Sequence, residues 1–395
     1  MEIYLEHLLE DVPFYQWVIL AVLLLFFIVQ MYYYIRYYNG IIRYSKKISD
    51  NRIQYEKKLN PVSVIICAQN EAENLESFLP SVLNQDYPQF EVIVVNDGST
   101  DQTSDLLERL DKQYKNLYHT FLFLFSKYTS RKKMCLTVGV KAAKYEHLLL
   151  LDADCEPVSK DWIRKMMVNY TEGTDVVLGY SKCCVENNFI GKIIRYDSIT
   201  SAIRYMGFAL CGKAYEGVAR NLSYKKELFF KNKGFSSHLN LISGDDNLFI
   251  QDIATPSNVR VEFSPKAITL NHRNETSTSF FYQKDIQLQT IKEYKKDILF
   301  SISVENTSRV LFYLLFTLLI ILFAISQEWI LAGCTFLLFL IRYFTQLNTI
   351  RKSAILLSEA PFALLIPILD LVLPLMSLYI LTIGKIGRKE ETMWR

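Results

Sequence analysis

Residues 13–35 form an apolar run without a charged side chain, and this run restricts the fold more than any other feature. About 20 apolar residues are enough for a helix to cross a bilayer. A cleaved signal peptide does not fit, because the run is too long, acidic residues precede it and no small-residue cleavage site follows. Basic residues are frequent in the linker over residues 36–59. The positive-inside rule therefore predicts a short extracytoplasmic N-terminus over residues 1–12 and a cytoplasmic domain after the linker.

Two further apolar runs lie near the C-terminus. They predict a helical hairpin over about residues 309–326 and 329–347, with a polar tip at Gln327 and Glu328. Arg342 falls near the cytoplasmic end of the second helix, where its long side chain can extend to the interface.

The last apolar segment, residues 354–384, contains Asp370 and three prolines. A single crossing would leave the basic tail, residues 385–395, outside the cell and against the charge rule. An interfacial or re-entrant stretch, or a tight pair of crossings, keeps this tail in the cytoplasm. An ionisable residue in such a segment indicates either a functional role or an ion pair within the bundle, and the sequence leaves both open for Asp370.

Composition excludes several classes of protein. The net charge is only +3, so no general basic field points to nucleic acid. The chain has seven cysteines, an odd number without metal-type spacing, which favours reduced thiols. It contains neither a G-x-G-x-x-G dinucleotide motif nor a Walker lysine loop.

The middle of the chain, about residues 60–300, alternates strand and helix patterns. Continuous apolar runs of the kind that form strands buried on both faces occur at 62–67, 90–95, 120–125 and 147–152. Helical patterns lie between them, including residues 71–84 and 131–144. This alternation predicts an α/β fold with a mostly parallel sheet flanked by helices. Ligands of such sheets bind outside the carboxyl ends of the strands.

Asp152 and Asp154 directly follow the fourth predicted strand. Two carboxylates at this spacing can both turn toward one divalent cation, and Mg²⁺ or Mn²⁺ takes oxygen ligands shared with substrate phosphates. A solvated loop or a helix cap is the alternative for these residues.

Asp245 and Asp246 follow Gly244 and open a helical pattern over residues 247–253. One interpretation is capping, because the helix dipole favours carboxylates at this end. The other is a general base, since adjacent carboxylates raise each other's pKa and can accept a proton from an attacking hydroxyl.

Basic residues mark two further positions. Lys132 and Lys133 open a predicted helix, where positive charge opposes the dipole, so either a phosphate partner or a solvated surface explains them. Arg220 precedes another helical pattern and fits a clamp on phosphate or sugar, or an ion pair with a site carboxylate.

Four segments in this order resemble family 2 glycosyltransferases: VSVIICAQNEAENL, VIVVNDGSTDQT, LLLLDADCEP and GDDNLF. The resemblance covers about residues 60–300 and implies a GT-A fold, a nucleotide-diphosphate sugar donor, a divalent metal (Mg²⁺ or Mn²⁺) and inversion at the sugar carbon. The flanking membrane segments look like those of cellulose and hyaluronan synthases.

The resemblance also implies roles for individual residues. Asp97 would recognise the base, Asp154 would bind the metal, and Asp246 would be the catalytic base supported by Asp245. Six residues would bind the nucleotide sugar: Ala68, Asn70, Glu71, Asp97, Lys133 and Asp152.

Two departures from the family pattern bear on the substrate. Gln69 stands where members often have an aromatic residue that stacks on the base. Processive members carry Gln-x-x-Arg-Trp near the acceptor, whereas the counterpart here keeps only Gln283, a candidate for acceptor or phosphate binding.

The sequence thus predicts a multi-pass bacterial inner-membrane enzyme with a cytoplasmic catalytic domain. It would transfer a sugar to a hydroxyl of a membrane-associated, lipid-linked or glycan acceptor, with membrane lipids around it. The alternatives are a non-catalytic membrane subunit of the same fold that assists a partner, and a processive polysaccharide synthase.

Overall fold

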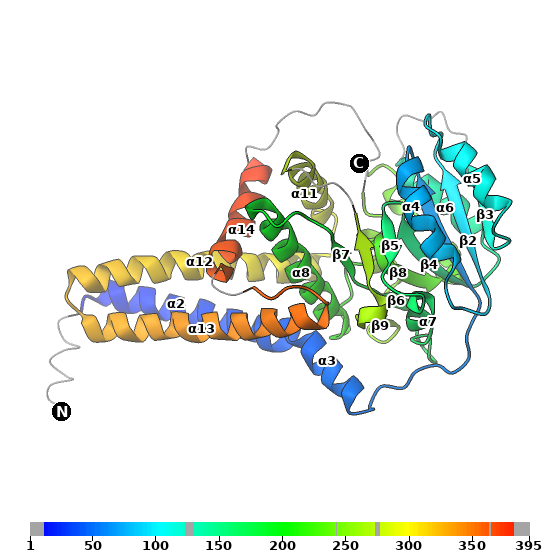
Figure 1. Cartoon of the computed structure of the whole chain (residues 1–395). Helices are drawn as coiled ribbons and strands as arrows, with labels where there is room; N and C mark the ends of the chain where they lie inside the picture. Colours follow the sequence, from blue (N-terminus) through cyan, green and yellow to red (C-terminus); the bar gives the residue numbers. More distant parts are fainter. Residues whose placement is uncertain (1–11, 123–129, 242, 273–276, 363–364, 383–395) are drawn as a thin grey trace.

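The computed structural model describes residues 12–122, 130–241, 243–272, 277–362 and 365–382. A layered α/β unit lies at one end of the molecule, and long helices extend from it as a bundle (Figure 1). The predicted N-terminal segment 1–11, the basic tail 385–395 and residues 123–125 of the third predicted strand lie outside the described residues.

The main sheet has seven strands in the order β3-β2-β1-β4-β8-β6-β9. The first four are parallel, β8 is antiparallel to β4 and β6, and β9 is parallel to β6. Their bounds are β1 Val62–Ala68, β2 Phe90–Asn96, β3 Leu117–Phe121, β4 His147–Asp152, β6 Val176–Leu178, β8 Leu222–Lys225 and β9 Val259–Val261. The prediction of a mostly parallel sheet is therefore confirmed.

A small second sheet lies beside the first, with the order β5-β10-β7. Its strands are β5 Cys155–Pro157, β7 Ser181–Cys183 and β10 Thr269–Asn271. Because β5 follows β4 almost directly, this sheet holds the loop that carries Asp154.

The predicted third strand is shifted. Apolar content indicated residues 120–125, but β3 begins at Leu117, where it pairs with Val92 of β2. β3 is an edge strand with Tyr118 and Phe121 exposed, so its bounds follow pairing with β2 rather than its apolar content.

Helices cover both faces of the sheet, which explains why β1 is buried along its whole length. α6 packs on the face of Ile65 and Cys67, whereas α4, α5 and α7 pack on the face of Val64 and Ile66. The bounds are α4 Ala72–Leu83, α5 Thr103–Asp111, α6 Arg131–Ala142, α7 Trp162–Met167, α8 Phe189–Ala209, α9 Lys226–Lys231, α10 Asn247–Ile253 and α11 Ser277–Ile291. Short helical turns are η2 Ala219–Asn221, η3 Ser236–His238 and η4 Pro265–Ala267.

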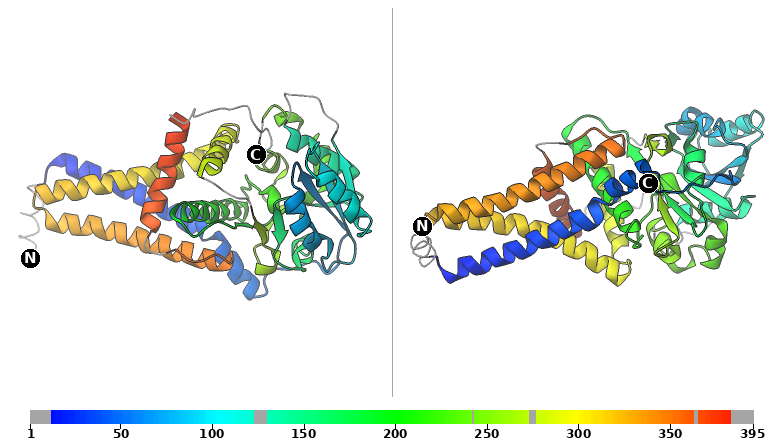
Figure 2. Two further views of the ribbon diagram at one scale, coloured as in Figure 1. Left: turned by 45° about the horizontal axis from the view of Figure 1, so that its top comes forward. Right: turned by 90° about the horizontal axis from the view of Figure 1, so that it is seen from below.

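Three helices in the described part of the chain are long and apolar enough to cross a membrane, and their windows include α2, α12 and α13. These run side by side, and α14 crosses them at a steep angle (Figures 1 and 2). The bounds are α2 Phe14–Tyr33, the π-turn η1 Tyr34–Tyr38, α3 Gly40–Ser49, α12 Lys296–Ile325, α13 Trp329–Leu356 and α14 Ile366–Thr382.

The hairpin of α12 and α13 is present, with Gln327 in the left-handed conformation (φ +60°) at its tip. Both helices are longer than their apolar runs. α12 begins at Lys296 because Ile298 and Ile302 pack into the core of the α/β unit, and α13 continues through the buried Ile350.

Arg342 does not extend to the interface, contrary to the prediction. It is buried, and its Nη2 lies 2.8 Å from Oδ2 of Asp370 on α14. Arg309 of α12 approaches Oδ1 of Asp370 at 3.4 Å and also pairs with Glu305. The hydroxyl of Tyr313 donates to Asp370 at 3.0 Å. These groups form a buried ionic network of two cations and two anions, so the network carries no net charge.

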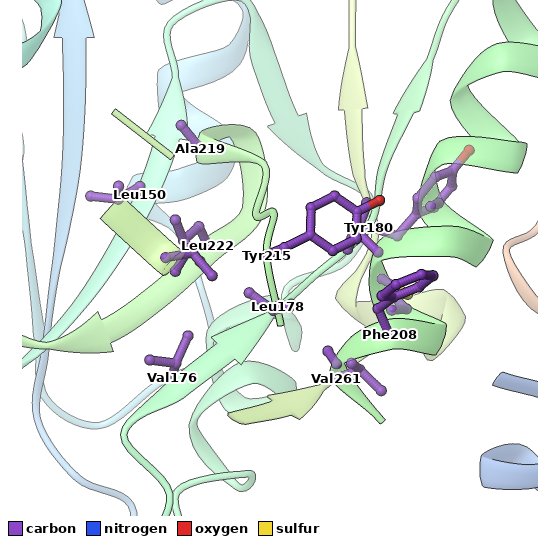
Figure 3. Packing of buried hydrophobic residues seen from close by; sticks show 14 of the residues in the cluster. Leu150, Val176, Leu178, Tyr180, Phe208, Tyr215, Ala219, Leu222 and Val261 are labelled. Carbon is purple, nitrogen blue, oxygen red and sulfur yellow. The ribbon is translucent and has the colours of Figure 1, made fainter. Parts of the chain in front are cut away.

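One hydrophobic cluster joins the α/β unit to the helices. It contains Leu150 and Leu178 of the sheet, Phe208 of α8 and residues of η1 and α14. Several of these side chains lie next to one another in Figure 3. At the junction, Tyr37 of η1 stacks on Phe208 with ring centroids 4.0 Å apart.

Candidate active site

A cavity of about 690 Å³ lies at the carboxyl ends of β1 and β4. Its floor includes Cys67 and Asp152 from these strand ends, and α8 and α11 provide its far wall. The acidic segments that follow β4 and precede α10 both line it. The fold therefore brings together residues that lie ~90 positions apart in the sequence: one acidic segment follows β4, and the other reaches the cavity from the start of α10.

The segment after β4 is held in place on both sides of Asp154. The carbonyl of Asp154 accepts a hydrogen bond from the amide of His272 at 3.0 Å, and the Cys155 thiol donates to its carboxylate at 3.3 Å. The His272 ring pairs with Glu156 at 2.8 Å and stacks on Phe78, which gives it a structural role beside the cavity. Asp154 itself lines the cavity, and its role as a metal ligand stays a prediction.

Asp246 caps α10, as one interpretation of this motif predicted, and it also lines the cavity, where its role as a general base stays a prediction. One carboxylate oxygen accepts from the amide of Asn247 at 2.7 Å, and the other accepts from the amide of Ala219 at 3.4 Å. Burial and, next, the carboxylate of Asp245 raise the pKa of Asp246 to about 7. Asp245 is buried at the same wall, and its Oδ2 has no hydrogen-bond partner among the described residues.

Lys132 connects the two acidic segments. Its ammonium lies 3.0 Å from Asp152 and 3.7 Å from Asp245. Burial alone would lower the pKa of Lys132, but the carboxylates of Asp152, Asp245 and Asp246 raise it above its ordinary value. A permanent cation therefore stands between the two acidic segments.

Lys133 does not line the cavity, which corrects the prediction that it lies near the phosphates. Its side chain is fully buried, and its ammonium donates to the carbonyls of His238, Leu241 and Ser243 at 2.6, 3.0 and 2.8 Å. It thus fixes the segment that leads to Asp245. Successive residues of a helix point about 100° apart, so only one of the two lysines can face the cavity.

Only some of the predicted nucleoside-binding residues line the cavity. Asn70 and Glu71 line the cavity, and Asn70 takes a left-handed conformation (φ +55°) while its side-chain oxygen accepts from the amide of Thr100 at 2.8 Å. Ala68 is buried at the end of β1 and does not line the cavity.

Asp97 also lies outside the cavity lining, contrary to its predicted place in the nucleoside pocket. Its carboxylate is fully buried, and both oxygens accept from the guanidinium of Arg131 at 2.7 Å. The Arg131 side chain is 31% exposed, so at this position the arginine, and not the aspartate beneath it, is accessible to solvent.

Arg220 and Gln283 line the cavity as predicted. The Arg220 guanidinium makes no hydrogen bond or ion pair to the residues that the structure describes, so its donors are available to a ligand. On α11, Nε2 of Gln283 is buried without a hydrogen-bond partner in the described chain.

The far wall is a connected set of polar side chains. Lys284 of α11 pairs with Asp197 of α8 at 2.6 Å and donates to Gln287 at 2.9 Å. Gln287 in turn donates to the buried Glu216 at 3.5 Å. This arrangement offers several hydrogen-bond donors and acceptors along the wall of the cavity.

Residues 63–231 match the family described as Glycosyl transferase family 2. The chain contains a family 2 glycosyltransferase domain. It is 30% identical over 152 residues to the poly-beta-1,6-N-acetyl-D-glucosamine synthase of Staphylococcus epidermidis, which covers 38% of this chain and 35% of that protein. It is 26% identical over 242 residues to the enzyme of the same name from Staphylococcus aureus (strain COL), covering 59% of this chain and 54% of the relative. The chain thus spans about one third to one half of the length of these curated relatives.

The fold also resembles a solved glycosyltransferase. The mannosyltransferase PcManGT from Pyrobaculum calidifontis, solved with GDP-Man and Mn²⁺, superimposes with a TM-score of 0.54 at 16% identity, covering 87% of this chain and 97% of that one. This similarity shows the GT-A fold, as the sequence predicted.

Sequence reasoning missed several residues of the glycosyltransferase domain. Lys132, rather than Lys133, faces the cavity, and Arg131 covers Asp97. Asp197, Glu216 and the helical pair Lys284 and Gln287 were not singled out for the far wall. The spacing of Gln283 and Gln287 by four residues, which places them on one side of a helix, was a usable signal.

Proposed function

We propose that the chain transfers a sugar from a nucleotide-diphosphate sugar to a hydroxyl of a membrane-associated, lipid-linked or glycan acceptor, with inversion. The observation that carries the proposal is the position of Asp246. This carboxylate lines the same cavity as Asp152 and Asp154, and its pKa of about 7 suits a general base near neutral pH.

In the proposed reaction, the acceptor oxygen attacks the anomeric carbon from the side opposite the diphosphate. The bond from the anomeric carbon to the diphosphate oxygen breaks, and the leaving group takes the electron pair. Asp246 accepts the proton of the attacking hydroxyl as the new glycosidic bond forms. One displacement inverts the configuration at the sugar carbon.

The charges of the cavity suit a divalent cation. Five carboxylates line its donor end and offer hard oxygen ligands, beside two cations, and Oδ2 of the buried Asp245 has no hydrogen-bond partner among the described residues. The lining acids and bases there are Glu71, Asp152, Asp154, Asp245, Asp246, Lys132 and Arg220. Mg²⁺ or Mn²⁺ fits this set, with Asp154 as the ligand from the chain. When bound, the metal would neutralise charge on the diphosphate leaving group.

Lys132 and Arg220 would bind the diphosphate, because both are cations that line the cavity on the side of Asp152. When the nucleotide sugar binds, phosphate oxygens would replace one of the two carboxylates that contact Lys132. Of the residues that the resemblance assigns to the nucleoside, Asn70 and Glu71 line the cavity and would contact it.

The acceptor would bind along α8 and α11. α11 packs against the apolar α14, which exposes Leu375, Leu378 and Tyr379. This neighbourhood supports an acceptor delivered from a lipid surface. We further propose that the glycosyltransferase domain lies on the cytoplasmic side of a bacterial inner membrane, since nucleotide sugars are made there.

A processive polysaccharide synthase is the second candidate, because the curated relatives named above are such synthases. The absence of the Arg-Trp pair after Gln283 favours single addition. Product length measured by mass spectrometry with an oligosaccharide acceptor distinguishes the two.

Nucleotide release tests the proposed function. Full-length protein in detergent is incubated with UDP-, GDP-, CMP- and dTDP-sugars and with Mg²⁺ or Mn²⁺, with and without EDTA and a mixture of oligosaccharide and lipid-extract acceptors. We expect release from one donor, lost with EDTA and in Asp246→Asn. Asp252→Asn is the matched control, because Asp252 lies on α10 outside the cavity lining and pairs with His238.

Two results would contradict the proposal. Full turnover in Asp246→Asn would show that Asp246 is not the general base. If calorimetry shows that no nucleotide binds in the presence of metal, the proposal of an enzyme is refuted and the non-catalytic subunit is favoured.

A further inference from the structure

Five exposed cations lie where the bundle meets the α/β unit, and we call them the basic collar. They come from two helical segments that are neighbours in space, α2–α3 and the end of α13. A hydrogen bond of 3.0 Å from Thr349 of α13 to Asn39, between η1 and α3, ties the two segments together. The members of the basic collar are Arg36, Lys46, Lys47, Arg351 and Lys352.

The two segments place Arg36 and Arg351 at the same depth. Arg36 follows Phe14, the first residue of α2, by 22 residues, and Arg351 follows Trp329, the first residue of α13, by 22 residues as well. At a rise of 1.5 Å per residue, both distances are about 33 Å, slightly more than the ~30 Å of a hydrocarbon core. If α2 and α13 cross the membrane, Arg36 and Arg351 lie at the level of the lipid headgroups, with Lys352 next to Arg351. Lys46 and Lys47 lie further along α3, on the side of the α/β unit, where their long side chains can reach back toward the headgroups.

The cations of the basic collar lack carboxylate partners in the described part of the chain. The nearest acidic residue on α3 is its C-terminal neighbour Asp50, which pairs with Arg52 at 3.4 Å. Arg43 is not a member, because its guanidinium donates to the carbonyls of Ile35 and Arg36 beside the π-turn. An array of exposed positive charge without protein counter-ions is complementary to an anionic surface.

The other side of α3 faces the protein. Its buried residues are Gly40 and Ile41, and Gly40 lies against Gly207 of α8, where an added Cβ would come within 3.0 Å of the Gly207 Cα. α8 also lines the catalytic cavity through Asp197 and Tyr205. The basic collar is therefore attached through a rigid backbone contact to the wall of the cavity.

We propose that the basic collar is a binding site for anionic lipid headgroups. Lys46 and Lys47 of α3 and Arg351 and Lys352 of α13 would each contact the phosphodiester groups of negatively charged lipids. This interaction fixes the height and tilt of the α/β unit above the membrane. The inference rests on α2 and α13 as membrane spans and does not depend on the reaction that the cavity catalyses.

Lipid binding to the purified full-length chain tests this inference. Phosphatidylglycerol or phosphatidylcholine is titrated into dodecyl maltoside micelles, and bound lipid is followed by native mass spectrometry and by the thermal unfolding midpoint. We expect phosphatidylglycerol to bind at least tenfold more tightly than phosphatidylcholine at low salt. Neutralising four collar residues (Lys46→Gln, Lys47→Gln, Arg351→Gln, Lys352→Gln) should remove this preference.

Two further variants keep the test decisive. A control that neutralises four exposed lysines of the α/β unit (Lys112, Lys115, Lys141 and Lys231, each to Gln) should keep the preference. A charge-conserving exchange of lysine and arginine in the basic collar should also keep it, which separates charge from folding.

Equal binding of the two lipids, or a preference that persists in the neutralised collar variant, overturns the proposal. An arm with soluble glycerol 3-phosphate identifies the source of the anion. If it competes with phosphatidylglycerol at equal concentration, the cations form a site for soluble phosphates, and the assignment to lipid is wrong.

Discussion

Removing the charge of Asp370 should destabilise the protein strongly, because this residue balances a buried network. In Asp370→Asn the network keeps the cations Arg309 and Arg342 but only one anion, Glu305. The variant also weakens two hydrogen bonds, of 2.8 Å from Arg342 and 3.0 Å from Tyr313. Breaking a buried ion pair in this way costs about 3–5 kcal/mol.

Removing the opposite charge as well should restore part of the stability. Arg342→Met alone leaves one excess anion and should cost about the same 3–5 kcal/mol. The double variant restores neutrality, since Arg309 and Glu305 remain as a pair. We therefore expect the double variant to lose less than either single variant, with a coupling free energy of roughly 3 kcal/mol.

Thermal unfolding of the four proteins in one detergent measures the effect. At ~2–4 °C per kcal/mol, each single variant should unfold roughly 6–20 °C below the parent, and the double variant should lie closer to it. The exposed pair of Arg109 and Glu76, also in contact at 2.7 Å, is the matched control and should couple by less than about 1 kcal/mol. If the loss in the double variant equals the sum of the two single losses, the side chains do not act as a pair and the reasoning is wrong.

Three other predictions follow from the cavity and the helix junction. Lys133→Met should lower the free energy of unfolding by about 3 kcal/mol or more in a denaturant titration, because it leaves three buried carbonyls without a donor. Nucleotide release should rise about tenfold per pH unit below pH 7 and level off above it, because the base works deprotonated and the pKa of Asp246 is about 7; a flat profile from pH 5.5 to 8.5 would exclude this base. Gly207→Ala should lower the thermal unfolding midpoint, because its Cβ would lie 2.2 Å from the carbonyl oxygen of Tyr37. Gly173→Ala is the comparison for backbone strain alone, because an added Cβ there meets no atom within 4 Å but the residue has a positive φ.

The sequence predicted the elements whose burial is complete. β1 and β4 are apolar because helices cover both faces of the sheet. Of the acidic residues that follow predicted strands, Asp152 and Asp154 line the cavity and Asp97 does not, whereas Asp246 reaches the same cavity from the start of α10.

What the sequence did not predict depends on angles and on long-range partners. Whether Lys132 or Lys133 faces the cavity follows from the rotation of α6 on the sheet, which Gly139 sets by letting Ile65 approach closely. The partner of Asp370 was equally open, because Arg342 lies 28 residues away on another helix and no periodicity relates the two.

The hydrophobic core that passes from the sheet through α8 into η1 and α14 makes the molecule hard to divide. A fragment cut at residues 60 and 300, for soluble expression, would leave Tyr196 and Phe208 without the tyrosines and helices that cover them. Such a fragment would expose an aromatic surface on the back of the catalytic wall. The helices outside the α/β unit therefore complete its hydrophobic packing, and structural or inhibitor studies of this protein require these helices in place.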